Sequence, residues 1–374
     1  MHMLEKGAFG KTYSAQAVEL LEKFCTIPAP SCHEDARVSA IVTWLSENGI
    51  SGCRVDAAKN VIIPYNDDGH CTLDVFAAHT DVVFPDLENL PVRREGDRLY
   101  CPGVGDDTAN FVALLMYARQ FFRDRVETGR GVLFVCNSCE EGLGNLKGVR
   151  RLFDDYGDRI ASFTSFDSVL GNGIVTTAVG SERYRITVHT EGGHSYKDFG
   201  ARNAIAILSS VITRLYGQST DSRLTTYNVG TVSGGTSVNS IAQNAECTYE
   251  FRAVEARSLD RMRSSFESII SSFRARNIDI GTECIGLRPC GGEVDICRLL
   301  SKAEKVLSSY SQPLTRGASS TDCNIPLSLG IPAICFGLIY AEGTHTRQEY
   351  ADLSTYSLGL DLGWDYILSV VLDD

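Results

Sequence analysis

Four short apolar runs, separated by segments with helical periodicity, constrain the fold of this chain more than any other feature. The apolar runs, each of which ends in polar side chains, cover residues 72–81, 131–141, 161–168 and 331–346. The helical segments cover residues 14–25, 35–49, 108–122 and 356–372. Continuous apolar runs that alternate with helices are typical of buried parallel strands. The pattern therefore predicts an α/β catalytic domain with a helix-flanked, mixed and mainly parallel sheet.

The segment from residue 180 to 289 has a different pattern. Its predicted elements are a strand at 183–191, a helix at 203–216, strands at 225–235 and 245–254, a helix at 258–277 and a strand at 279–288. This β-α-β-β-α-β order is that of a ferredoxin-like α+β unit. We therefore expect a separate domain at 180–289, inserted into a catalytic domain made of residues 1–179 and 290–374.

The composition narrows the class of partner. A chain of 374 residues is long enough for two domains, and its net charge of -12 argues against binding to nucleic acid or anionic membranes. No run approaches the ~20 apolar residues that cross a membrane, and the start lacks a signal peptide pattern, so we expect a cytoplasmic protein. The 13 scattered cysteines are expected to be reduced; Cys136 and Cys139 alone are closely spaced, which is a weak zinc or redox signal.

Metal-capable side chains follow the predicted strands. In α/β sheets ligands bind outside the carboxyl ends of the strands, so these side chains should meet at one edge. They are His79, Asp81, Glu140, Glu141, Asp167 and His345. His79 and Asp81 are two residues apart and can face the same side of a strand. Because a ligating histidine commonly donates its second ring N–H to a carboxylate, Asp81 is a candidate partner for His79.

Two pairs of adjacent acids need an explanation. Asp106 and Asp107 lie in a glycine-rich turn before a helix. Asp107 could be the N-cap of that helix, whereas Asp106 is better explained as a carboxylate bridging two metal ions. Glu140 and Glu141 could form a solvated acidic turn, but the similar placement of the other acids and histidines favours a nearby cation. Neighbouring side chains in extended chain point in opposite directions, so one glutamate could bind metal while the other acts as general base.

With these motifs, the chain resembles the co-catalytic zinc metallopeptidases and amidohydrolases that include peptidase T, aminoacylase, carboxypeptidase G and succinyl-diaminopimelate desuccinylase. The resemblance rests on AAHTD, GVGDDTAN, SCEEGLGN, SFDS and GTHTRQEYADL, and on the inserted lid or dimerisation domain. It implies two divalent metal ions, zinc first with cobalt or manganese as alternatives. It also implies a short peptide substrate and a homodimer formed through the inserted domain.

The resemblance assigns roles to individual residues. His79 and Asp167 would bind one metal ion, Glu141 and His345 the other, and Asp106 would bridge them. Asp81 would orient His79, Glu140 would be the general base, and the peptide bond from Asp106 to Asp107 would be cis. In the inserted domain, His194 would stabilise the oxyanion, while Asn239 and Arg252 would contact the substrate carboxylate. The structural alternatives are a turn histidine for His194 and a strand arginine paired on the sheet surface for Arg252.

The substrate prediction follows from the same resemblance. Aspartate at position 167 accompanies aminopeptidases, so we predict a tripeptidase-like enzyme that cleaves short peptides with a free N-terminus. Thr108 and Asn110 replace the lysine and glycine that are common in the family, and the loop at 316–324 is one residue longer than usual, which leaves substrate choice open. The alternatives are an N-acyl amino acid deacylase with the same metal centre, a non-catalytic protein with structural metals, and a thiol hydrolase built on Cys139 or Cys323.

Overall fold

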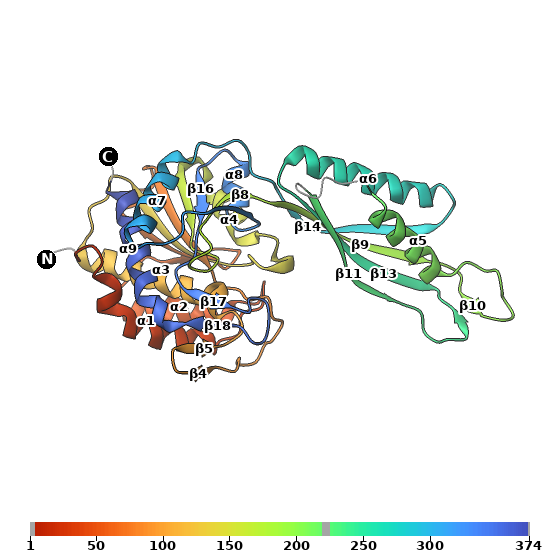
Figure 1. Cartoon of the computed structure of the whole chain (residues 1–374), viewed down its shortest axis with the longest axis horizontal. Helices are drawn as coiled ribbons and strands as arrows, with labels where there is room; N and C mark the ends of the chain where they lie inside the picture. The colour runs from red at the N-terminus through yellow and green to blue at the C-terminus, as the bar shows by residue number, and fades with distance from the viewer. Residues whose placement is uncertain (1–3, 219–224, 373–374) are drawn as a thin grey trace. The chain divides into compact units, whose positions relative to one another are not determined.

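The computed structural model describes residues 4–218 and 225–372, and the chain divides into two compact units (Figure 1). Unit 1 consists of Met1–Ala178 and Gly292–Asp374. Unit 2 consists of Val179–Gly291. Unit 2 is therefore inserted into the sequence of unit 1, and each unit is described by itself.

Unit 1 is built on a mixed sheet that is mainly parallel, as predicted. In spatial order its described strands are β1 (Arg54–Val55), β2 (Val61–Tyr65), β6 (Gly131–Asn137), β3 (Leu73–His79), β7 (Ile160–Ser165), β16 (Ala333–Cys335), β8 (Ile174–Ala178) and β15 (Arg316–Ser319). The central strands β6, β3, β7 and β16 run parallel to one another. On one side, β2 pairs antiparallel with β6 and with β1. On the other side, β8 pairs antiparallel with β16 and parallel with β15. The parallel centre places several strand ends at one edge of the sheet.

Helices cover both faces of this sheet. One face packs against α1 (Phe9–Cys25), α2 (Asp35–Glu47), α3 (Ala109–Asp124), α7 (Cys297–Ser309) and α9 (Tyr356–Val371), and the other against α4 (Lys147–Tyr156) and α8 (Asn324–Ser328). In β3, Phe76 and Ala78 pack in the core of the first face, while Val75 and Ala77 pack in the core of the second. Burial on both faces explains why the strands read as continuous apolar runs.

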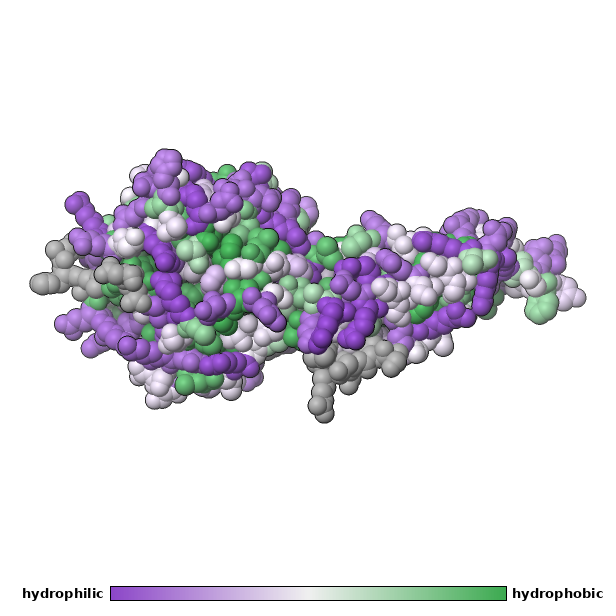
Figure 2. Space-filling model, turned by 90° about the horizontal axis from the view of Figure 1, so that it is seen from above, coloured by the Kyte–Doolittle hydropathy of each residue, from purple (hydrophilic) through white to green (hydrophobic). Residues whose placement is uncertain are grey.

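The outer surface carries hydrophilic side chains over much of the face that Figure 2 shows, with smaller apolar areas between them. Within the described segments, no helix combines the length and apolar character that crossing a membrane requires.

The fourth predicted strand, at 331–346, differs from the structure. Only β16 (Ala333–Cys335) joins the parallel sheet; the chain then turns and forms a small antiparallel sheet of β17 (Tyr340–Glu342), β18 (Tyr350–Asp352), β5 (Arg98–Tyr100) and β4 (Arg93–Glu95). At the turn, Gly337 passes so near Ser168 that a Cβ would lie 2.1 Å from its carbonyl oxygen. Asn110 also accepts a hydrogen bond from the Leu338 N–H at 2.9 Å. His345 consequently lies in the connection between β17 and β18.

Unit 2 has the predicted β-α-β-β-α-β order. Strands β9 (Gly180–His189), β11 (Thr225–Gly234), β13 (Asn244–Ala253) and β14 (Asp279–Arg288) form an antiparallel sheet in the order β11-β13-β9-β14. Helices α5 (Ala204–Tyr216) and α6 (Ala256–Arg274) pack on it around a core that includes Leu208, Phe251 and Phe266. The short strands β10 (Gly193–His194) and β12 (Ser240–Ile241) pair separately.

Candidate metal centre

The ends of β3 and β6 begin the site. His79, the last residue of β3, pairs in register with Asn137, the last residue of β6. The next residue, Thr80, donates from its N–H and from its hydroxyl to the Asn137 carbonyl, at 2.7 and 2.9 Å. The chain segments that leave the two strands, residues 79–81 and 139–141, therefore stay side by side.

The structure brings all five predicted metal ligands together. Among the described residues, three overlapping groups have possible ligand atoms within 4.8 Å of one another: His79 with Glu140 and Glu141, His79 with Asp107 and Asp167, and Asp106 with Glu141 and His345. The predicted general base Glu140 belongs to the first group. The shared members His79 and Glu141 join the three groups into one continuous cluster.

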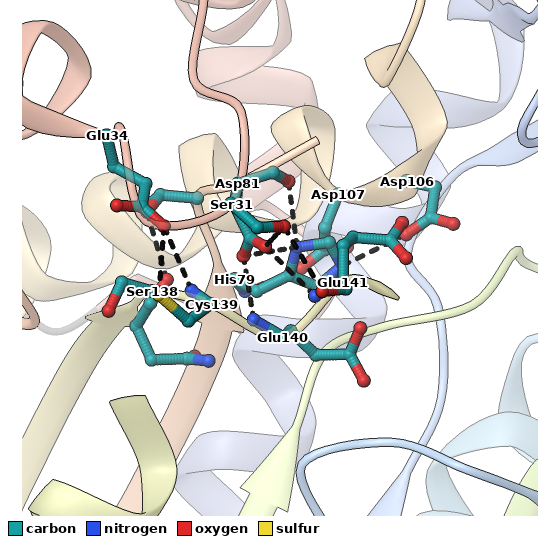
Figure 3. Close-up of polar contacts among 12 residues, drawn as sticks. Ser31, Glu34, His79, Asp81, Asp106, Asp107, Ser138, Cys139, Glu140 and Glu141 are labelled. Atoms are coloured by element: carbon teal, nitrogen blue, oxygen red, sulfur yellow. Dashed lines mark hydrogen bonds and ion pairs between the residues drawn. The ribbon is translucent and has the colours of Figure 1, made fainter. Parts of the chain in front are cut away.

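Asp106 lies between the two histidines. Its Oδ1 is 3.0 Å from His79 Nε2, and its Oδ2 is 3.2 Å from His345 Nε2. His345 Nε2 also lies 3.0 Å from Glu141 Oε1 (Figure 3 shows His79, Asp106 and Glu141 grouped). One carboxylate thus presents each oxygen to a different histidine, which is the arrangement that a bridging ligand requires. Imidazole nitrogens with carboxylate oxygens form a donor set that suits zinc and other first-row divalent ions.

The electrostatics of the cluster favour bound cations. Burial raises the pKa of Glu141 to about 7, and burial together with the Asp106 carboxylate raises the pKa of Asp167 to about 7. Burial opposes the ionisation of Asp106 too, but hydrogen bonds to His345 and His79 hold its pKa well below the usual value. The hydrogen bonds to Asp106 and Glu141 raise the pKa of His345 to about 10. These buried acids repel one another, and divalent cations would remove that repulsion.

Asp81 acts on the cluster mainly through the main chain of the two glutamates. Its Oδ1 accepts the Glu140 N–H and its Oδ2 the Glu141 N–H, both at 2.9 Å, and Oδ2 also accepts the Ser31 hydroxyl at 2.6 Å. His79 Nδ1 lies 3.0 Å from the Asp81 carbonyl oxygen and 3.5 Å from Oδ1. The nearest partner of His79 Nδ1 is therefore the main-chain carbonyl oxygen of Asp81, while the Asp81 carboxylate positions the two glutamates.

The N-cap interpretation of Asp107 is wrong. The N-cap of α3 is Thr108, which makes no side-chain capping bond. Asp107 is fully buried; its Oδ2 accepts the His79 main-chain N–H at 3.0 Å, and its Oδ1 accepts from the Asn110 amide. The peptide bond from Asp106 to Asp107 is cis, as the family resemblance implies. Asp107 therefore supports the cluster, and Asn110 links it to the turn before β17.

Glu349 is a residue of this site that the sequence analysis missed. It is almost completely buried, and its carboxylate accepts three main-chain hydrogen bonds from the glycine-rich turn. Gly103 N–H donates to Oε2 at 2.7 Å, while the N–H groups of Gly105 and Asp106 donate to Oε1 at 2.8 and 3.1 Å. Glu349 thus fixes the turn that presents Asp106. Its position four residues after His345, inside a motif already noted, was the available signal.

Replacement of this acceptor provides a test. We expect Glu349→Gln to lower the free energy of unfolding by ~1–3 kcal/mol, because an amide has one acceptor oxygen for three main-chain donors. Burial raises the pKa of Glu349 to about 7, so urea unfolding should be followed at pH 8, where the carboxylate is ionised. Glu47→Gln, at the exposed end of α2, is the matched control and should change stability by less than ~0.5 kcal/mol. Equal effects of the two substitutions would contradict the role of Glu349.

The three predicted residues of the inserted domain lie in unit 2 and do not all come together there. His194 and Asn239 are neighbours, since the Ser195 N–H donates to the Asn239 carbonyl at 3.1 Å. Arg252 lies near the far end of β13, ~27 Å from the first residue of that strand at ~3.4 Å per residue. It pairs with Glu250, with Nε 2.8 Å from Oε1. The surface-paired alternative therefore describes the contacts of Arg252, and its substrate role stays a prediction.

Comparisons with known proteins show that the fold of this chain is similar to that of metallopeptidases. Residues 176–276 match the peptidase dimerisation domain family. A tripeptidase from Staphylococcus aureus has a similar structure, with 18% identity, a TM-score of 0.78, and coverage of 96% of this chain and 99% of that chain. A dinuclear metal-binding peptidase from Bacillus subtilis is similar over 97% of this chain and 99% of that chain, with 15% identity and a TM-score of 0.67.

A curated relative matches over a shorter length. Succinyl-diaminopimelate desuccinylase from Corynebacterium glutamicum is 24% identical over 199 residues, which are 53% of this chain and 53% of the relative. The match thus spans about half the length of that protein. Together these similarities confirm the resemblance to the metallopeptidase and amidohydrolase family and the presence of an inserted dimerisation domain.

Proposed function

We propose that this protein is a dinuclear-metal hydrolase that cleaves peptide amide bonds, acting as an aminopeptidase on short peptides such as tripeptides. One observation carries the proposal. The Asp106 carboxylate faces His79 with one oxygen and His345 with the other, beside the adjacent acids Glu140 and Glu141. The similar fold of a protein described as a tripeptidase supports the choice of short peptides.

The cluster divides into two ligand sets that share Asp106. His79 and Asp167 would hold one ion, and Glu141 and His345 the other. Zinc is the first choice for both positions, with cobalt or manganese as alternatives that the same donors accept. When bound, the two ions supply Lewis-acid chemistry that lowers the pKa of water and polarises the amide carbonyl.

The side chains of the protein handle the protons and the substrate. Glu140 takes the proton of the attacking water and returns it to the leaving amine. Asp81 holds Glu140 in place through its main-chain N–H. His194 would stabilise the oxyanion, and Asn239 and Arg252 would contact the substrate carboxylate, as the resemblance implies. The dimerisation domain match supports a homodimer formed through unit 2.

A second candidate is an N-acyl amino acid deacylase with the same metal centre. It is favoured by the similarity to a relative named for removing a succinyl group. Both candidates use the same proton transfers, so the distinction between them lies in the substrate. A free amino group on the residue before the scissile bond marks the aminopeptidase, and an acyl group at that position marks the deacylase.

The test combines metal analysis with two substrates. We expect protein purified without chelators to hold about two divalent ions per chain and to hydrolyse trialanine but not N-acetyl-trialanine or N-acetyl-alanine. Metal content would be measured by mass spectrometry and hydrolysis by chromatography of released alanine. Cleavage of the acetylated compounds alone would support the deacylase. A protein that regains neither metal nor activity with zinc, cobalt or manganese would overturn both proposals.

A further inference from the structure

Two cysteines that are distant in the sequence meet beside the metal centre. Cys32 follows α1 and Cys139 follows β6, 107 positions apart in the sequence, yet their Sγ atoms lie 3.0 Å apart. Cys32 is exposed and Cys139 is buried. A disulfide needs a sulfur separation of ~2.05 Å, so an approach of about 1 Å would join the two thiols.

One carboxylate holds both cysteines in this position. Glu34, itself fully buried, accepts the main-chain N–H of Cys32 at 2.7 Å and that of Cys139 at 3.1 Å. The Cys139 thiol donates to the same oxygen at 3.3 Å (Figure 3 shows Glu34 and Cys139). Lys59 Nζ donates to the Cys32 carbonyl at 2.7 Å. The main chains of both cysteines are therefore fixed, and the meeting of the sulfur atoms does not depend on side-chain rotation alone.

The backbone conformation supports the same view. Cys32 and Cys139 have φ values of 70° and 57°. Residues other than glycine and asparagine seldom adopt this left-handed backbone conformation. Such conformations persist only where surrounding contacts hold them. Cys136, which is close to Cys139 in the sequence, is not part of this pair, because it packs in the apolar core of unit 1. The partner of Cys139 is therefore Cys32.

We propose that Cys32 and Cys139 are a redox modification site that closes to a disulfide when a small-molecule disulfide such as oxidised glutathione is the oxidant. The exposed Cys32 thiolate attacks one sulfur of the oxidant and releases one glutathione thiol. Cys139 then attacks the sulfur of Cys32 in the mixed disulfide and releases the second thiol. The protein loses two electrons and two protons, and the oxidant gains them as two thiols.

The new bond would act on the site of the proposed hydrolase, so this step rests on the proposed function. Cys139 directly precedes Glu140, and Cys32 directly follows Ser31, whose hydroxyl bonds to Asp81. Displacement of catalytic groups by about 1 Å can lower a rate ~100-fold. We therefore expect oxidation to lower kcat at least ~3-fold and dithiothreitol to restore it.

The first experiment detects the bond without reference to activity. Metal-loaded protein is incubated with oxidised glutathione, its remaining thiols are alkylated, and the peptides are mapped under non-reducing conditions. We expect a linked peptide pair containing Cys32 and Cys139, which dithiothreitol separates. The pair should be absent from Cys32→Ser and Cys139→Ser and present in Cys297→Ser, which removes an exposed cysteine elsewhere. Glutathione that stays on Cys32 without a link to Cys139 would overturn the proposal.

The second experiment measures turnover of the same samples on trialanine. We expect oxidant to lower kcat of the wild type and of Cys297→Ser, and to leave Cys32→Ser unchanged. A fully linked wild type with unchanged kcat would overturn the effect on turnover. Absence of hydrolysis in every reduced sample would instead count against the proposed function, while the peptide map would still decide whether the disulfide forms.

Discussion

Glu140→Ala is expected to lower kcat by about 10²–10⁴-fold while the protein keeps its fold and its metal ions. The reason is that this carboxylate transfers the proton from water to the leaving amine, whereas the five residues assigned to metal binding remain. The Asp81 contact with the Glu140 main-chain N–H also remains, because alanine keeps that donor. The measurements are the kcat for trialanine, the metal content per chain and the circular dichroism spectrum.

The neighbouring residue provides the matched control for this experiment. Glu141→Ala removes a carboxylate that lies 3.0 Å from His345 and should therefore lose metal as well as activity. The two substitutions delete the same chemical group at adjacent positions, so their difference separates the general base from the ligand. Turnover of Glu140→Ala within ~10-fold of the wild type would sink the assignment of the base.

Asp106→Asn is expected to reduce the metal content from about two ions to one or none and to abolish measurable hydrolysis. Asparagine has nearly the same size but offers one acceptor oxygen, and its NH₂ group would face one of the two histidines that the carboxylate now contacts. Metal content and zinc titration of chelator-treated protein are the measurements.

A distant substitution of the same kind controls for the change of charge. Asp97→Asn lies in the exposed turn between β4 and β5 and should bind two ions as the wild type does. If Asp106→Asn still bound two ions with wild-type affinity, the bridging assignment would be wrong. Loss of metal in both variants would point to a general effect of charge on metal uptake.

The convergence of the predicted ligands could be anticipated because the fold brings their side chains to one place by simple rules. His79 ends β3 and Glu141 follows β6; the two strands are parallel neighbours, and such strands end at the same edge of a sheet. The order of strands and helices in unit 2 could be predicted as well, because each element has its own periodicity and turn residues. Such features are local, and a short window of sequence contains them.

The remaining features depend on contacts between distant positions. The Glu349 carboxylate accepts a hydrogen bond from Gly103, which is 246 positions away in the sequence. The residues next to Glu349 in the sequence do not indicate that its carboxylate accepts three main-chain hydrogen bonds. The turn at Gly337 depends on its approach to Ser168, so the run at 331–346 reads locally as one strand. In the local sequence, Asp107 resembles the N-cap of the following helix, and only the fold shows that its carboxylate accepts the His79 main-chain N–H. Such contacts leave no periodic trace in the sequence.

The insertion of unit 2 has a consequence for the order in which the protein becomes functional. The residues from His79 to Asp167 leave the ribosome before unit 2, whereas His345 and Glu349 leave it afterwards. A nascent chain therefore carries four of the five predicted metal ligands through the whole synthesis of the inserted unit: His79, Asp106, Glu141 and Asp167. Neither the contact of His345 with Asp106 nor the bonds of Glu349 to the glycine-rich turn can form until then. On the proposed assignment, the ligand set of the second ion, Glu141 and His345 with Asp106, is complete only after the inserted unit has been translated. A chain that ends before His345 lacks one ligand of that set.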